Sequence, residues 1–299
     1  MIKYGLRKLR NKFVKYFSSY GVITGLLNYL ISYALQFRKI YSRKKEMLSL
    51  PVNGPHTIIL DKLNQNKFVI VNIDQFPGFE KVKSHLLNAS KVTEGVSMAD
   101  LKNKFSQVSS KAFWVDILPS DENVRNEIFN FFQSPEIIAV IGRYLGEKPH
   151  LESVSYFYSP FVNNSTGEAS QLWHKDRDQY NKLKIFYSPF GTSERNGCTK
   201  IFNHNIGTFK TYPNYPWYFN DKEAVKNKWP LEKIVNLELS DEEFGMVDTG
   251  LLAHKGADKQ VEDRFQLIVS YGASPSRLKI SLWKNLQKKA VSQQPLGQI

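Results

Sequence analysis

Two short stretches of this sequence hold residue types that bind a transition metal. The first reads Trp173-His174-Lys175-Asp176. The second begins at His254, eighty residues after His174, and is followed by Arg264. Imidazole and carboxylate groups suit ferrous iron, and a face of two histidines and one carboxylate leaves three coordination positions open. We therefore expect an iron site whose open positions take a cosubstrate and dioxygen.

The spacing of His174 and Asp176 suits binding of one ion. Residues i and i+2 of an extended segment point to the same face. The third ligand must come from a distant segment, and the candidates are His254 and His204. His254 is the better candidate because Arg264 follows it, whereas no patterned arginine follows His204.

Arg264 opens a run with strand character, and in that run four side chains share one face: Arg264, Gln266, Ile268 and Ser270. An arginine that faces a protein interior needs an anion, and its planar fork matches a carboxylate with two hydrogen bonds. A dicarboxylic cosubstrate bound to the metal would supply that carboxylate.

The elements that must position these residues are mostly strands. Alternation and β-branched or aromatic content predict strands at 57–60, 67–73, 113–118, 151–159, 183–187, 199–202, 234–239 and 265–272. Helices are expected at 78–90, 121–133 and 134–145, the last with Ser134 as N-cap, Pro135 in the first turn and Gly146 as its stop. This pattern predicts a β-barrel or β-sandwich with helices around it.

The net charge of +13 is located at the two ends of the chain. Residues 1–48 hold eleven Lys and Arg against the single acid Glu46, and residues 277–299 hold five against none. We therefore predict a basic N-terminal segment, 1–48, a catalytic domain, 49–276, and a basic C-terminal tail, 277–299. The single cysteine, Cys198, excludes internal disulfides and cysteine-rich metal sites and indicates a reducing, cytoplasmic location.

Between Lys15 and Arg38 the chain has twenty-two residues without a charge. Small and polar residues recur there every three or four positions, so a helix over 16–37 would be amphipathic. Basic clusters on both sides give no asymmetry that would orient a span. A helix lying on the inner face of a membrane is favoured over one packed on the domain, and both over one that spans the bilayer or a cleaved signal peptide.

The motifs resemble those of the phytanoyl-CoA dioxygenase family of iron(II)/2-oxoglutarate oxygenases. The resemblance lies in Gln171-x-Trp173-His174-x-Asp176 with Asp178, in Leu183-Lys184-Ile185-Phe186 with Asn196-Gly197, and in Asp248-Thr249-Gly250 before His254-Lys255-Gly256 and Arg264. It differs at Gly197-Cys198, at Asn203-His204-Asn205 and in a 251–253 turn that is one residue longer.

The resemblance implies a mainly β fold with flanking helices (α+β) around a double-stranded β-helix, the jelly-roll or cupin-like core. It implies His174, Asp176 and His254 as iron ligands and Arg264 as the partner of the distal carboxylate of 2-oxoglutarate. Lys184, Ser270 and Gln171 are further candidates for binding this cosubstrate, and His204 becomes a turn residue.

Hydroxylation is expected rather than halogenation, because related halogenases replace the ligand carboxylate that Asp176 supplies here. The basic N-terminus points to a lipid, a lipid-linked glycan or another small molecule near the membrane. Lys175 and Arg177 are expected to face solvent or balance charge, and the same interpretation is given to Lys255. The aromatic residues of 155–158 are expected either to line the pocket or to fill the core.

Three other interpretations compete with this one. Asp176 and Asp178 could bind the metal and nucleotide sugar of a glycosyltransferase, which would leave Trp173, His254 and Arg264 without a role. The chain could also be a non-catalytic binding protein of the same fold. Nucleic-acid binding is disfavoured because the basic residues lie at the termini and not on an aromatic strand face.

Overall fold

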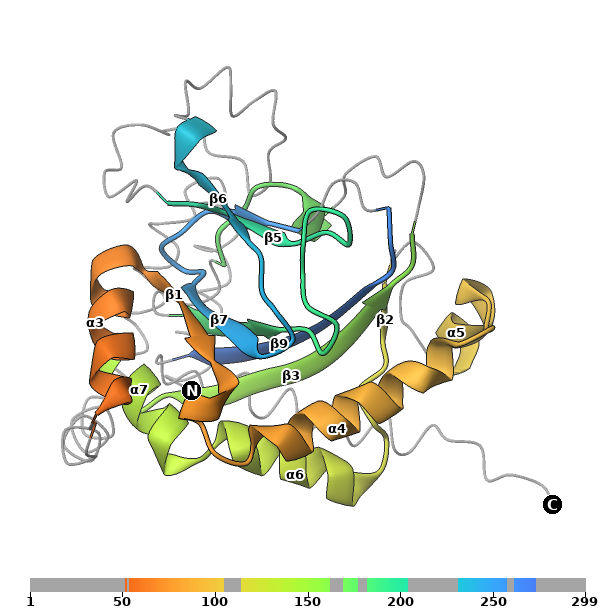
Figure 1. Ribbon diagram of the computed structural model, residues 1–299, viewed down its shortest axis with the longest axis horizontal. Helices are drawn as coiled ribbons and strands as arrows, with labels where there is room; N and C mark the ends of the chain where they lie inside the picture. Colours follow the sequence, from red (N-terminus) through yellow and green to blue (C-terminus); the bar gives the residue numbers. More distant parts are fainter. Residues whose placement is uncertain are drawn as a thin grey trace, which may run out of the picture.

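Two antiparallel β-sheets face each other in the computed structural model, which describes residue 52 and residues 54–104, 114–161, 169–176, 182–203, 231–256 and 261–272. The larger sheet has the strand order β1-β7-β4-β9-β3-β2, and the smaller has the order β6-β5-β8 (Figure 1). The bounds are β1 Phe68–Asn72, β2 Val115–Asp116, β3 His150–Ser159, β4 Lys182–Tyr187, β5 Thr199–Phe202, β6 Ile234–Leu237, β7 Glu243–Asp248, β8 His254–Lys255 and β9 Arg264–Gly272. The structure confirms the prediction of a mainly β fold with flanking helices.

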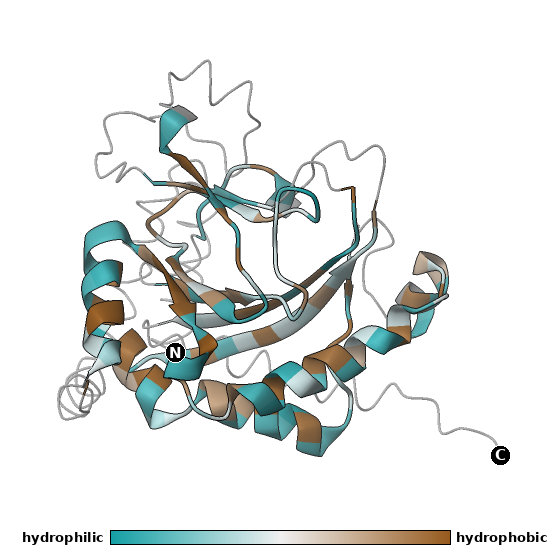
Figure 2. Ribbon diagram, viewed as in Figure 1, coloured by the Kyte–Doolittle hydropathy of each residue, from teal (hydrophilic) through white to brown (hydrophobic). Residues whose placement is uncertain are grey.

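Helices cover the outer face of the larger sheet, while the smaller sheet lies across its other face (Figure 1). Their bounds are α3 Pro55–Asn66, α4 Phe79–Ser90, α5 Met98–Lys104, α6 Glu122–Phe132 and α7 Pro135–Leu145. Figure 2 shows apolar and polar bands alternating along α4 and α6. In α4 the buried side chains Phe79, Val82 and Leu86 follow helical spacing. Burial of one such side chain stabilises the fold by about 1.5–3 kcal/mol.

The larger sheet therefore separates two apolar clusters. The first lies between helices and sheet and includes Leu86, Phe132, Tyr156 and Tyr271. The second is smaller, lies between the two sheets and includes Phe186, Ile201 and Leu237. A Cβ on Gly245 would come within 2.8 Å of the Leu237 side chain, so a glycine in β7 lets Leu237 pack close to the sheet.

The predicted helix signals of α7 are confirmed. Ser134 is the N-cap, Pro135 lies in the first turn, and Gly146 ends the helix in the left-handed conformation with φ 74°. The prediction of a strand at 57–60 is wrong, because these residues lie in α3. Gly54 and Pro55 start the helix, and Ile59 and Leu63, four residues apart, form its buried face. A short β-branched run does not distinguish the two structures.

Other differences concern the ends of strands and elements that were not predicted. Within the predicted strand 113–118 only Val115–Asp116 is a strand, and β6 ends at Leu237. The sequence patterns did not indicate α5, β7 or β8. The segments 1–48 and 277–299 lie outside the described residues, as does the expected helix at 16–37, so these divisions stay predictions. Among the described helices, none combines the length and the apolar character that a membrane span requires.

Candidate metal centre

The backbone brings His174 and His254 side by side. Each donates its backbone N–H to the carbonyl of the other, at 2.9 and 2.8 Å, in an isolated antiparallel bridge. His254 lies in β8 and pairs with Ile201 of β5. The backbone N–H of Asp176 donates to the carbonyl of Thr249 at 2.9 Å. These hydrogen bonds place three polar side chains from distant segments on one side of the smaller sheet.

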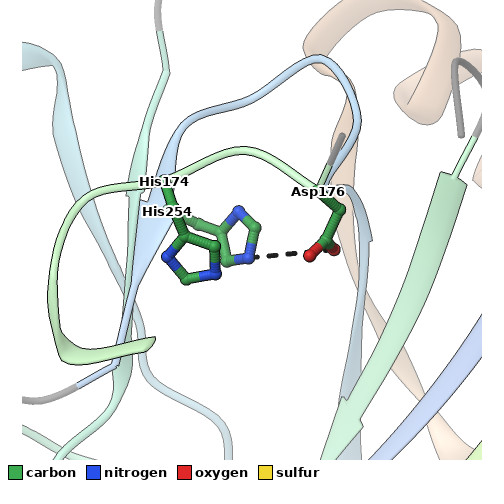
Figure 3. Close-up of side chains that lie close together, drawn as sticks. All are labelled: His174, Asp176 and His254. Atoms are coloured by element: carbon green, nitrogen blue, oxygen red, sulfur yellow. Dashed lines mark ion pairs between the residues drawn. The ribbon is translucent and has the colours of Figure 1, made fainter. Parts of the chain in front are cut away.

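The three side chains point toward one another (Figure 3). One ligand atom from each of His174, Asp176 and His254 lies within 4.8 Å of the others. His254 Nε2 is 4.0 Å from Asp176 Oδ2, so one ion with bonds of about 2.1 Å fits between these two atoms. This is the grouping that the spacing of the residues predicts.

Both imidazoles are oriented by backbone carbonyls. His174 Nδ1 lies 2.8 Å from the carbonyl of Leu172, and His254 Nδ1 lies 3.3 Å from that of Leu252. Donation from Nδ1 leaves the lone pair on Nε2, the usual arrangement of a histidine that binds a metal. His254 Nε2 is buried and has no hydrogen-bond partner among the described residues. A buried polar atom without a partner is costly, and a bound cation would satisfy it.

The charges of the site favour metal-binding protonation states. Burial lowers the pKa of His254 well below its usual range, His174 and Lys184 lower it further, and Asp176 opposes them. Burial would raise the pKa of Asp176, but Lys184, His254 and Lys182 outweigh that effect and hold this pKa far below its usual value. Lys184 Nζ lies 2.7 Å from Asp176 Oδ2. The site therefore offers a neutral imidazole and an ionised carboxylate.

Two of the three candidate ligands share a cavity with Arg264. The cavity has a volume of about 370 Å³, and His174, His254 and Arg264 line it. The Arg264 Nη2 group donates to Thr199 Oγ1 at 3.3 Å and to Gln266 Oε1, and its Nε is buried without a partner in the described ranges. Burial lowers the pKa of Arg264 to about 10, which leaves the guanidinium charged at neutral pH.

Gly256 lies against this guanidinium. A Cβ on Gly256 would be 3.6 Å from Arg264 Nη1 and 3.3 Å from the carbonyl of Ser170. No ion pair with an acid joins Arg264 in the part of the chain that the structure describes. The arrangement is a fixed, desolvated cation at one end of the cavity, which suits an anionic ligand.

Four predicted side chains of β9 do lie on one face, since Arg264, Gln266, Ile268 and Ser270 all line the cavity. Lys184 lines it too, while Gln171 is buried but is not part of the lining. Ser270 pairs with Lys184 in the register of β9 and β4, six residues along the strand from Arg264. His204, Asp178 and Arg177 lie outside the described residues.

The structure also shows where the residues next to the candidate ligands and the aromatic residues of β3 lie. Lys255 is buried, with its ammonium 5.2 Å from the centroid of the Trp173 ring, so of its two expected roles, facing solvent and balancing charge, the first is wrong. Phe157 lines the cavity, whereas Tyr156 and Tyr158 belong to the core beneath the helices. Lys175 is half-buried.

The sequence patterns did not indicate the polar partners of two cations in the cavity. Thr199 and Gln266 hold Arg264, and Glu152 contacts the cavity residue Lys182. The alternation of Ser153, Ser155, Phe157 and Ser159 in β3 was the available signal for a polar inner face, because residues two apart share one side of a strand.

No family model matches the sequence, and no curated protein matches it. Among solved structures, the epimerase SnoN in complex with Fe3+, alpha ketoglutarate and nogalamycin RO is similar to this chain, with a TM-score of 0.50 and 13% identity over 73% of this chain and 83% of SnoN. EctD from S. alaskensis with 2-oxoglutarate and 5-hydroxyectoine has a TM-score of 0.51 and 11% identity over 74% of this chain and 76% of EctD. These similarities establish the double-stranded β-helix fold, as the resemblance implied.

Proposed function

We propose that this chain is an iron(II)- and 2-oxoglutarate-dependent oxygenase. One observation carries the proposal: His174, Asp176 and His254 converge, and the two histidines line a cavity together with the buried Arg264. The structurally similar proteins SnoN and EctD were crystallised with alpha ketoglutarate or 2-oxoglutarate, and SnoN also with Fe3+. The sequence motifs place the chain, within this proposal, near the phytanoyl-CoA dioxygenase family.

The residues present fit the iron ion, as the unpartnered His254 Nε2 indicates. His174, His254 and Asp176 would hold it, and the carbonyls of Leu172 and Leu252 would keep the imidazoles in the metal-binding tautomer. Iron bound there would supply the chemistry by which dioxygen converts a C–H bond of the substrate into C–OH. One oxygen atom would enter the substrate, and the other would enter succinate as 2-oxoglutarate loses carbon dioxide. Lys184 would keep Asp176 ionised and oriented.

Arg264 would bind the distal carboxylate of 2-oxoglutarate. Its guanidinium presents several donors in one plane, and Thr199 and Gln266 restrict its rotation. Lys184 and Ser270 face the same cavity and stay candidates for contacts with the cosubstrate. Gln171, which is buried beside the metal strand, stays a candidate on the basis of its motif alone.

Hydroxylation is the outcome that we favour, because Asp176 supplies the carboxylate that a halogenating site would lack. SnoN is an epimerase, so inversion of a stereocentre is the second candidate outcome for the same ligand set. The glycosyltransferase interpretation requires Asp178 beside Asp176, and it still gives no role to the two histidines that lie with Asp176.

The proposed place of action is the inner face of a membrane, reached through residues 1–48. Eleven Lys and Arg in this segment would attract anionic lipid. The substrate would then be a lipid-linked glycan, a lipid headgroup or a small molecule made nearby.

The test is anaerobic titration of the purified protein with iron(II) and then 2-oxoglutarate. We expect one iron per chain and a metal-to-ligand charge-transfer absorption band that His174→Ala abolishes. His85→Ala is the matched control, because His85 of α4 pairs with Glu127 of α6 and is not part of the cavity lining. Equal iron binding in wild type and His174→Ala, or turnover of a nucleotide sugar without iron, would overturn the proposal.

A further inference from the structure

A second cluster of charges lies at the end of the cavity away from Arg264. Arg264 and Gly272 are the first and last residues of β9, and Lys182 of β4 pairs with Gly272. On the other side of Gly272 the register places His150 of β3. Arg264 and Lys182 therefore approach the cavity at opposite ends of β9, Lys182 from the neighbouring strand β4, with the ion pair of Lys184 and Asp176 between them.

Glu152 joins the two sides of this cluster. Its carboxylate lies 3.2 Å from Lys182 Nζ through Oε2 and 3.7 Å from His150 Nε2 through Oε1. The side chains of Lys182 and Glu152 are only 9% and 11% exposed, so this is a largely desolvated pair. His150 Nδ1 is also buried, and it has no hydrogen-bond partner within the described ranges.

An irregularity in β3 creates this arrangement. In a regular strand the neighbours Glu152 and Ser153 would point to opposite faces. The pairing of β3 with β9 shifts register between Leu151 and Ser153. As a result Ser153 lines the cavity while Glu152 reaches Lys182, which lines it too. Bulges that redirect a side chain in this way are frequent beside active sites.

The cavity wall is suited to oxygen-rich ligands. Among the seventeen described residues that line it, six have hydroxyl side chains and four have aromatic or aliphatic ones. Ser153 and Ser155 lie in β3 between the Lys182 end and the middle of the cavity. A hydrocarbon chain would leave these polar groups without partners, whereas a hydroxylated molecule would satisfy them.

The charges add a preference for an anion. Among the described residues, the cations Lys182, Lys184 and Arg264 line the cavity, and the acids Glu152 and Asp176 contact two of them. Ferrous iron and doubly charged 2-oxoglutarate cancel each other, so the described residues leave one positive charge in the loaded cavity. Glu152 offsets Lys182 and Asp176 offsets Lys184, so this excess is shared by the whole cavity, and an anion that binds beside the two lysines would neutralise it.

We propose that Lys182 and Ser153 bind an anionic, oxygen-rich group of the substrate, a carboxylate or a phosphate, and that this anion competes with Glu152 for the Lys182 ammonium. This inference rests on the proposed function. It assigns the substrate class as a polar hydroxylated anion, as found in a sugar acid or a phosphorylated headgroup, and excludes a plain hydrocarbon chain at the metal.

The experiment measures how added ligands perturb the charge-transfer band of the anaerobic iron(II)–2-oxoglutarate protein at saturating 2-oxoglutarate and constant ionic strength. The probes are gluconate and glycerol 3-phosphate, with glucose and glycerol as neutral counterparts and hexanoate as the hydrocarbon acid. We expect gluconate or glycerol 3-phosphate to shift the band at millimolar concentration. Which of the two binds more tightly distinguishes a carboxylate substrate from a phosphate substrate.

Two substitutions in one ion pair give the decisive comparison. Lys182→Met removes the cation, so anion affinity should fall about tenfold or more, whereas Glu152→Gln removes the competing charge, so anion affinity should rise. Both substitutions remove the ion pair between Lys182 and Glu152. If the ion pair were only structural, both variants would change anion affinity in the same direction. Lys200→Met is the control, since Lys200 lies on β5 beside the lining residue Thr199 but is not itself part of the lining.

The inference is overturned if hexanoate binds as tightly as gluconate, if no anion shifts the band, if both variants change affinity in the same direction, or if the anions bleach the band by displacing 2-oxoglutarate. Absence of the band before any probe is added would instead contradict the proposed function itself. Spectra of wild type and variants are compared at equal occupancy of iron and 2-oxoglutarate.

Discussion

The guanidinium of Arg264 shows how a single side chain can specify a ligand. It is 8% exposed and still charged, and its described partners are the neutral groups of Thr199 and Gln266. A buried charge without a counterion is destabilising, so the site is completed when an anion binds. Under the proposed function, the arginine would therefore contribute more to binding than to folding.

Replacing Arg264 by Lys tests this role. Lysine keeps the charge but loses the planar pair of donors, so we expect the dissociation constant of 2-oxoglutarate to rise about tenfold or more with unchanged iron content. The measurement is 2-oxoglutarate titration of the charge-transfer band. Arg195→Lys is the control, because Arg195 is exposed and pairs with Glu262. Unchanged affinity in Arg264→Lys would show that the cosubstrate carboxylate lies elsewhere.

For single residues, the sequence predicted which side chains come together at the site better than it predicted the contacts that hold them. His174, Asp176, His254 and Arg264 were found because their types and spacing are unusual in combination. Lys182 and Glu152 were not found, since their pairing depends on the irregular register of β3 with β9, which no local pattern encodes. For the same reason the buried position of Lys255 over Trp173 could not be predicted.

Among the elements, the turn between β7 and β8 contributes to the position of two proposed metal ligands. Asp248 Oδ1 accepts a hydrogen bond from the backbone N–H of Leu251 at 2.8 Å, and Asp248 Oδ2 accepts one from the Tyr144 hydroxyl of α7 at 2.7 Å. The same turn offers the carbonyl of Thr249 to Asp176 and leads into His254. A partly buried hydrogen bond thus connects the helix layer to the proposed metal site.

Tyr144→Phe should loosen that connection. We expect a loss of about 1–3 kcal/mol in the free energy of unfolding and an iron affinity lower by about tenfold, as for other groups that orient metal ligands. The measurements are urea unfolding and iron titration. Tyr187→Phe is the matched control, because Tyr187 donates to the carbonyl of Asp241 on the helix side. If both variants lose stability and iron affinity alike, Tyr144 has no positioning role.

Elements with strong local signals were predicted well, and those defined by pairing were not. The bounds of β5 agree with the expected 199–202, and α7 has its expected cap and stop. The two residues of β8 form a strand because β5 and the segment of His174 hydrogen-bond to them, not because of their own propensity. The run at 57–60 became a helix because Leu63 extends its apolar face beyond the window that suggested a strand.

For the whole molecule, the division of apolar surface explains how a polar cavity is tolerated. The large cluster between helices and sheet includes Leu86, Phe132 and Tyr271, on the face of the sheet opposite the cavity. The inner face of β3 can then carry serines without loss of the main core. Stability and ligand recognition are therefore placed on opposite faces of the larger sheet.

The charge of the N-terminal segment leads to a prediction about location. Each Lys or Arg near an anionic bilayer contributes about 1 kcal/mol of attraction, and six of them lie at positions 3, 7, 8, 10, 12 and 15. Replacing these six by Gln in the full chain should weaken binding to phosphatidylserine vesicles by at least about a hundredfold, and the affinity of the unmodified chain should fall with salt. Cosedimentation measures this, with iron and 2-oxoglutarate binding as the check on folding.

Neutralising the five Lys and Arg of residues 277–299 is the comparison, because it removes a similar charge from the other end of the chain. If residues 1–48 direct the protein to the membrane, the N-terminal variant should lose more vesicle affinity than the C-terminal one. Equal losses would mean that total charge alone determines binding. Loss of nucleic-acid affinity with vesicle affinity intact would favour a nucleic-acid partner over a membrane, because both attract basic residues but only the lipid also takes up the apolar face expected at 16–37.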